Sequence, residues 1–133
     1  MIKQMEFIGE HVVYVVELGA ITNDSFVIST NERIAFINQQ PSSRIYAIIY
    51  DITHAQIKVA NLSLARWSMQ IDPNMIGVVI ISENPLVRFV GKFLSTGLGL
   101  NAAVVNALTD AKQQAEAFVA AELNKPNRTS NKD

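Results

Sequence analysis

Two short and almost entirely apolar runs constrain the fold of this chain more than any other feature. They are residues 44–50 (RIYAIIY) and 75–82 (MIGVVIIS). Short runs rich in isoleucine and valine are typical of strands covered on both faces, as in a parallel sheet packed between helices. Segments with helical spacing of apolar residues follow each run, and this alternation indicates an α/β domain.

Three further segments complete the strand pattern. Residues 2–8 and 11–18 flank Gly9-Glu10 and predict an N-terminal β-hairpin, in which the valine-rich second segment suits a half-buried strand. Residues 101–107 (NAAVVNA) predict one more short strand. The predicted sheet is therefore small and mixed, with an antiparallel hairpin followed by parallel strands.

Four helices are expected between and after these strands. Thr22–Ser25 is a cluster of N-cap residue types, and the helix that follows is expected to bury Val27, Ile34 and Ile37 and to end at Pro41. A second helix is expected within residues 55–71. The positions at suitable spacing are Val59, Leu62, either Ala65 or Arg66, and Met69, and its beginning can be extended.

The last two helices have clear boundary signals. Asn84 is a good N-cap and Pro85 suits the first helical position, so the third helix is expected over residues 85–96, ended by Gly97 or Gly99. Thr109 is expected to cap the fourth, residues 110–123, whose inner face holds Ala111, Ala115 and Phe118. The predicted order is β-β-α-β-α-β-α-β-α.

Length and composition fit one domain over residues 1–123, followed by a flexible polar tail over residues 124–133. The chain has 133 residues, 49% of them hydrophobic, and no cysteine, which excludes disulfides. A net charge of −1 does not favour nucleic acid. Neither a signal peptide nor an apolar run long enough for a transmembrane segment is found, so a cytoplasmic location is expected.

The polar residues near the strand ends do not form a catalytic pattern. Asp51 follows a buried strand, but a phosphate-accepting aspartate needs an acidic pair and a late lysine that the spacing does not supply. A turn or helix cap is the favoured role of Asp51. His54 has no nucleophile or oxyanion donors at useful spacing. His11 lies far from any acidic cluster. We therefore expect no enzyme activity, no metal and no cofactor.

One stretch suggests a binding surface. Residues 87–100 are apolar on more than one face, and only Arg88 and Lys92 are charged. Two interpretations remain open, a helix that binds a partner or a membrane surface and a helix packed on the sheet. Trp67 presents the same choice between the edge of the core and an interface.

The order of elements resembles the STAS domain, the fold of SpoIIAA-like bacterial anti-sigma-factor antagonists. The resemblance covers residues 3–123 and includes the motif Asp51-Ile52-Thr53 after the first buried strand. It implies a serine, phosphorylated in that family, at the start of the helix after the third strand. Here Asn61 stands at that position and Ser63 is two residues later, so the usual phosphorylatable serine is lacking.

The resemblance implies a non-catalytic regulatory or protein-interaction module in bacterial signalling, which docks to a protein partner or to itself. The alternative hypothesis is a carrier that holds a small apolar molecule or lipid between sheet and helices. The first hypothesis predicts partly exposed apolar residues, and the second predicts an apolar pocket. The candidate partner-binding residues are Asp51, Thr53, His54, Asn61, Ser63, Trp67, Phe89, Phe93 and Leu98.

Overall fold

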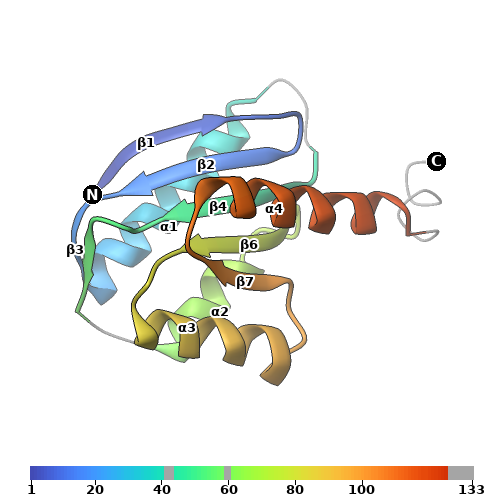
Figure 1. Ribbon diagram of the computed structural model, residues 1–133. Helices are drawn as coiled ribbons and strands as arrows, with labels where there is room; N and C mark the ends of the chain where they lie inside the picture. The colour runs from blue at the N-terminus through green and yellow to red at the C-terminus, as the bar shows by residue number, and fades with distance from the viewer. Residues whose placement is uncertain (41–43, 59–60, 126–133) are drawn as a thin grey trace.

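A five-stranded sheet with the strand order β1-β2-β4-β6-β7 forms the centre of the molecule (Figure 1). The computed structural model describes residues 1–40, 44–58 and 61–125. The hairpin strands β1 and β2 are antiparallel, and every other neighbouring pair in this sheet is parallel. The predicted mixed sheet is therefore confirmed. Its strands are β1 (Ile2–Phe7), β2 (Val12–Glu17), β4 (Tyr46–Asp51), β6 (Met75–Ile81) and β7 (Ala102–Val105).

Helices cover both faces of the sheet, as the buried apolar runs require. The side chains of α4 (Leu108–Leu123) pack on one face, where Ala111 and Ala115 are fully buried as predicted. The opposite face is covered by α1 (Asn23–Asn38), α2 (Leu62–Gln70) and α3 (Pro85–Lys92). Successive strand residues point to opposite faces, so Val12 packs toward α4 and Val13 toward the three helices.

A second, two-stranded sheet was not predicted. It pairs β3 (Gly19–Ile21) in parallel with β5 (Ala55–Ile57). Residues 55–57 are thus a strand, and the helix expected within residues 55–71 begins only at Leu62. The expected roles of Val59 in this helix and of Pro41 in ending α1 lie outside the described residues, as do residues 126–133 of the predicted tail.

The end of α3 changes its helical winding. The predicted helix over residues 85–96 runs as α3 to Lys92 and then as the π-helical turn η1 (Phe93–Gly97). The amide of Leu98 donates to the carbonyl oxygen of Phe93, five residues earlier, at 3.1 Å. This wider turn lets Leu94, Leu98 and Leu100 pack against the same core cluster. Of the two interpretations of residues 87–100, a helix packed on the sheet therefore describes most of the segment.

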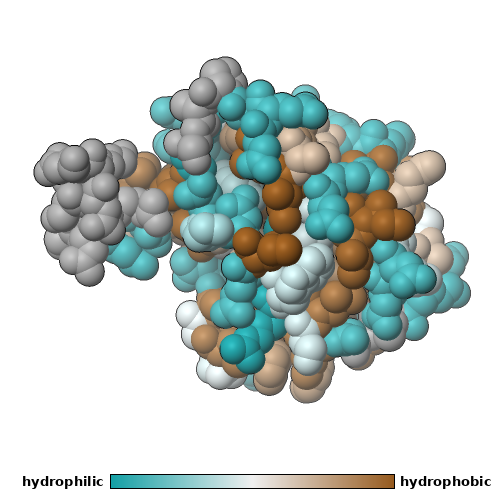
Figure 2. Space-filling model, turned by 180° about the vertical axis from the view of Figure 1, so that it is seen from behind, coloured by the Kyte–Doolittle hydropathy of each residue, from teal (hydrophilic) through white to brown (hydrophobic). Residues whose placement is uncertain are grey.

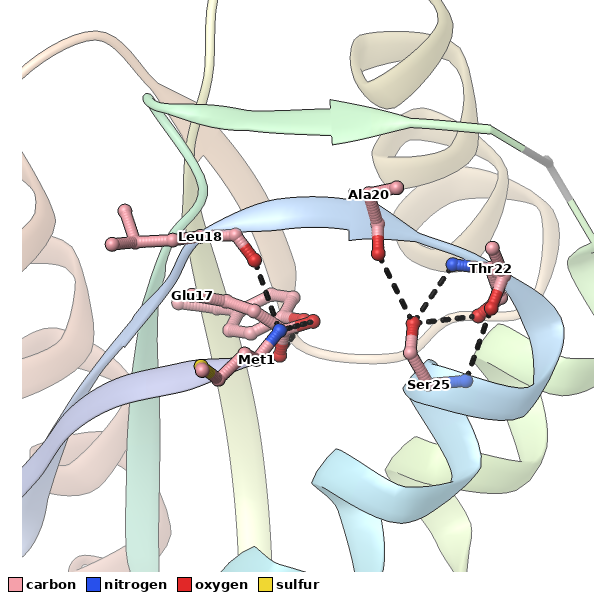
Figure 3. Close-up of polar contacts among 7 residues, drawn as sticks. Met1, Glu17, Leu18, Ala20, Thr22 and Ser25 are labelled. Atoms are coloured by element: carbon pink, nitrogen blue, oxygen red, sulfur yellow. Dashed lines mark hydrogen bonds and ion pairs between the residues drawn. The ribbon is translucent and has the colours of Figure 1, made fainter.

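Two of the three predicted helix N-caps are present in the structure. Thr22 caps α1, since its side chain accepts from the amide of Ser25 while Ser25 Oγ accepts from the amide of Thr22 (Figure 3). Asn84 caps α3 and Pro85 opens it, as predicted. The predicted cap of Thr109 is wrong, because α4 begins at Leu108 with Ala107 in the cap position.

Candidate functional site

The buried face of α1 is polar. The sequence predicted that Val27, Ile34 and Ile37 would be buried, but all three are only half-buried. The residues that α1 buries are Ser29, Thr30 and Arg33. The predicted buried face was wrong because polar side chains of α1 are buried against partners on α2. A pattern of apolar residues within α1 does not reveal such partners.

Arg33 joins α1 to α2 through Ser68. Its Nη2 donates to the carbonyl oxygen of Ser68 at 2.9 Å, and its Nη1 lies 3.4 Å from Ser68 Oγ. The hydroxyl oxygens of Thr30 and Ser68 are hydrogen-bonded at 2.9 Å. Arg33 is only 8% exposed, and its buried Nε has no hydrogen-bond partner in the part of the chain that the structure describes. A permanently charged side chain is thus held among neutral acceptors.

These polar groups line one side of a cavity of about 150 Å³ between the sheet and helices α1, α2 and α3. We call it the inner cavity. Besides Arg33 and Ser68, most of its wall is aliphatic, with Val87, Val90 and Leu94 contributed by α3 and η1. From the side of α1 and α2, the molecular surface shows apolar side chains gathered in a band between polar ones (Figure 2).

Two tyrosines of β4 bind buried or half-buried acids on this side of the sheet. Tyr50 lines the inner cavity and donates to Glu17 Oε1 at 2.8 Å, and Tyr46 donates to Asp72 Oδ2 at 2.6 Å. Burial is the largest cause of a raised pKa at both hydroxyls, and the charge of Arg33 acts in the opposite direction. Both hydroxyls therefore stay protonated and keep donating to their acids.

Glu17 is fully buried, and its second partner is the chain's first amino group (Figure 3). The Met1 ammonium nitrogen lies 3.9 Å from Glu17 Oε2 and donates to the carbonyl oxygen of Leu18 at 2.9 Å. The carboxylate is thus held by one tyrosine hydroxyl and one nearby positive charge. Buried charges in proteins are normally paired in this way.

Asp51 lies at the carboxyl end of β4 and acts as a turn cap. Its Oδ1 accepts from the amide of Thr53 at 3.1 Å and from Thr53 Oγ1 at 2.6 Å, which confirms the capping interpretation. Tyr14 donates to Oδ2 at 2.7 Å. Burial raises the pKa of Asp51, but the hydrogen bonds from Thr53 and Tyr14 and the charge of His54 outweigh it and lower the pKa overall. Burial, with Asp51 as acceptor, raises the pKa of Tyr14 to about 12.

A second hollow, which we call the edge cleft, lies beside Thr53 at the carboxyl ends of the parallel strands. Its volume is about 290 Å³. Three of its polar groups already have partners within the protein, since Ser82 Oγ accepts from the amide of Asn84, Asn84 Oδ1 caps α3, and Asn106 accepts from Arg88. The inner cavity is the stronger candidate site because it contains a buried polar atom without a partner.

The remaining candidate residues differ in their exposure. Asn61 caps α2 by accepting from the amide of Leu64 at 3.0 Å and also lines the inner cavity. Thr53, His54 and Ser63 are exposed. Phe89 is 61% exposed on α3. The other three apolar candidates are half-buried, and two of them pack on the core: Trp67, Phe93 and Leu98.

Thr30, Arg33 and Ser68 were not predicted to be site residues. A signal was present for the first two, because residues 29–33 form a polar block inside a helix that is otherwise largely apolar. Arg33 also shares a helical face with Thr30 and Ser29, because it follows them by three and four positions. Nothing in the sequence marks Ser68, whose partners come from a helix that lies 35 residues earlier in the chain.

The arrangement of the elements defines the class of fold. An antiparallel N-terminal hairpin leads into a parallel sheet with one helix on one face and three on the other. The chain is similar in structure to an uncharacterised protein of the DUF3478 family from Shewanella loihica PV-4, which has a SpoIIAA-like fold. The TM-score is 0.58 at 12% identity, over 86% of this chain and 92% of that chain.

The predicted SpoIIAA-like fold is thereby confirmed. The sequence matches no protein-family model and none of the curated proteins. Within the described residues, no group of three or more histidine, aspartate and glutamate side chains is placed to hold a metal ion. In the same part of the chain, every helix is too short or too polar to cross a membrane.

Proposed function

We propose that this protein is a non-catalytic binding module that holds a small, largely apolar molecule in the inner cavity. The observation that carries the proposal is the cavity of about 150 Å³ with its mainly aliphatic wall. An apolar cavity of roughly this size in another protein takes up benzene, so the volume suits a ring or a chain of about six carbons. Such a ligand would lie among side chains of three helices and the sheet.

The position of the cavity connects ligand binding to the exposed surface of α3. Val87 and Val90 of α3 line the cavity, while Leu86 and Phe89 of the same helix are 42% and 61% exposed. A ligand that moves α3 would also move this exposed pair. The proposal thus combines the carrier hypothesis with a regulatory role, since an occupied cavity changes the surface offered to other molecules.

Titration with 1-hexanol, a neutral probe of suitable size, tests the proposal. In ¹H–¹⁵N NMR spectra of the full chain, we expect shifts concentrated at residues that line the inner cavity. Ala65→Leu adds bulk inside the cavity and should weaken 1-hexanol binding by about tenfold or more. Ala35→Leu is the matched control, because Ala35 is exposed on α1.

Two results would overturn the proposal. One is a set of shifts scattered over the surface rather than around the cavity. The other is equal binding by the Ala65→Leu variant and the wild type, provided that the variant is folded. Thermal melting of both alanine variants supplies the check on folding.

Protein docking is the second candidate function, and the exposed pair Leu86 and Phe89 favours it. The pair is small, whereas a stable interface normally buries about 800 Å² on each partner. We therefore place docking second and assign a second copy of this chain as the partner. Multi-angle light scattering over a concentration series should then show a dimer that Phe89→Ser dissociates. A monomer at every concentration excludes self-docking.

A further inference from the structure

The inner cavity has an unbalanced positive charge in its wall. Arg33 is 8% exposed, and within the described residues no carboxylate oxygen lies within 4.0 Å of its guanidinium group. Its hydrogen bonds are to the neutral oxygens of Ser68 and to the hydroxyl of Tyr46, and within the described residues its buried Nε has no partner. Burying an unpaired charge is costly, so buried arginines are normally paired with an anion.

The acids on this side of the sheet are already bound by other groups. Glu17 accepts from Tyr50 and lies near the Met1 ammonium, and Asp72 accepts from Tyr46. The charge of Arg33 reaches both hydroxyls, where it lowers the pKa against the larger effect of burial. Each acid thus has its own donors, and the guanidinium retains unused hydrogen-bonding capacity beside the cavity.

We propose that the ligand of the inner cavity is a small amphipathic monocarboxylate, with its carboxylate bound by Arg33 and its apolar part against α3. This inference rests on the proposed function and names the class of ligand. The planar fork of a guanidinium matches a carboxylate, and an ionic hydrogen bond is roughly twice as strong as a neutral one.

Charge and size both restrict the ligand. Among the described residues that line the cavity, Arg33 is the only lysine or arginine, so one negative charge is balanced and a doubly charged phosphate is not. Glu17, buried behind Tyr50, would repel further negative charge. The volume of about 150 Å³ limits the apolar part to a ring or a short chain.

The test compares hexanoate with 1-hexanol, which have the same carbon chain and differ in charge. Binding to the full chain is followed by the fluorescence of Trp67, the only tryptophan, which precedes Ser68 on α2. We expect hexanoate to bind more tightly than 1-hexanol. Arg33→Gln should weaken hexanoate binding by about tenfold or more and change 1-hexanol binding much less.

Matched variants exclude a general effect of charge. Arg66→Gln removes an exposed arginine from α2, next to Trp67, and should leave hexanoate binding unchanged. Equal losses in the Arg33→Gln and Arg66→Gln variants would overturn the inference. Arg33→Lys keeps the positive charge without the planar fork and should retain part of the preference for hexanoate.

The outcomes separate this inference from the proposed function. If wild-type protein binds hexanoate and 1-hexanol equally well, the cavity binds apolar molecules and the assignment of a carboxylate is wrong. If it binds neither, both proposals fail. Should Arg33→Gln not fold, the wild-type comparison and the Arg33→Lys variant still decide. The inference requires that wild-type protein prefer hexanoate and that Arg33→Lys reduce this preference, and an unchanged preference in Arg33→Lys would overturn it.

Discussion

Tyr50→Phe removes a single oxygen atom, and we expect it to destabilise the protein more than the same change elsewhere on β4. The lost hydroxyl donates to Glu17 Oε1 at 2.8 Å. The side chain of Glu17 is fully buried, and among the described residues Oε2 has no hydrogen bond, only the Met1 ammonium at 3.9 Å. The variant therefore leaves a buried carboxylate without any side-chain hydrogen bond.

The magnitude follows from the charge and burial of the acceptor. Hydrogen bonds to charged groups contribute about 1.5–3 kcal/mol to stability, and loss of the donor leaves the acceptor unsatisfied. We therefore expect the free energy of unfolding to fall by about 2–3 kcal/mol. Tyr46→Phe is the matched control, because Asp72 is only half-buried and also accepts from the amide of Asn74. Its expected cost is about 1 kcal/mol.

Urea denaturation of the wild type and both variants at neutral pH measures these differences in the free energy of unfolding. The comparison requires that this free energy fall with urea concentration at the same slope in all three proteins. A double-mutant cycle with Glu17→Gln isolates the Tyr50–Glu17 interaction, since the cost of Tyr50→Phe should shrink once the charge is absent. If Tyr50→Phe costs no more than Tyr46→Phe, the buried carboxylate does not depend on this hydroxyl and the reasoning is wrong.

Three further predictions concern other parts of the fold. In Gly91→Ala the new Cβ would clash with Val104 Cγ2, so we expect the free energy of unfolding in urea to fall by about 1–3 kcal/mol, partly restored by Val104→Ala. A gain in stability would contradict the close contact. Asn61→Ala should cost about 0.5–2 kcal/mol by removing the α2 cap, whereas Asn61→Ser should cost less, and equal losses would refute the capping role. Because the folded-state pKa of Asp51 is lowered, its stabilising effect is present above the ordinary pKa of 3.8 and is lost as pH falls through the lower folded value. The stability difference between wild type and Asp51→Asn, measured against pH, should narrow in acid, and a difference that widens there would refute this.

The central strands and the third helix were predictable because local and tertiary signals agree. The run at residues 75–82 is apolar on both faces and becomes β6, which has β4 and β7 as parallel neighbours. Asn84 and Pro85 satisfy the first turn of α3 by local hydrogen bonding and backbone geometry alone. Such features need no knowledge of the rest of the fold.

The candidate site was much less predictable, because it depends on pairing between distant residues. Arg33 is buried only because Ser68 supplies acceptors, and a helical pattern read from α1 alone places the apolar residues inward. The strand β5 is another such case, since Ala55–Ile57 is extended through pairing with β3. The position of Asn61 at the start of α2 was predicted from the resemblance, whereas its place in the cavity wall was not.

The π-helical turn of η1 bears on how sequences with this fold should be aligned. One residue between Phe93 and Gly97 is extra relative to a regular α-helix, because Leu98 bonds to Phe93 rather than to Leu94. Deleting it would leave a regular α-helix in which Leu98 keeps its place against the core. Distant relatives with a regular helix here should therefore show a one-residue gap in this turn, and with that gap in place their core leucine should fall in the column of Leu98.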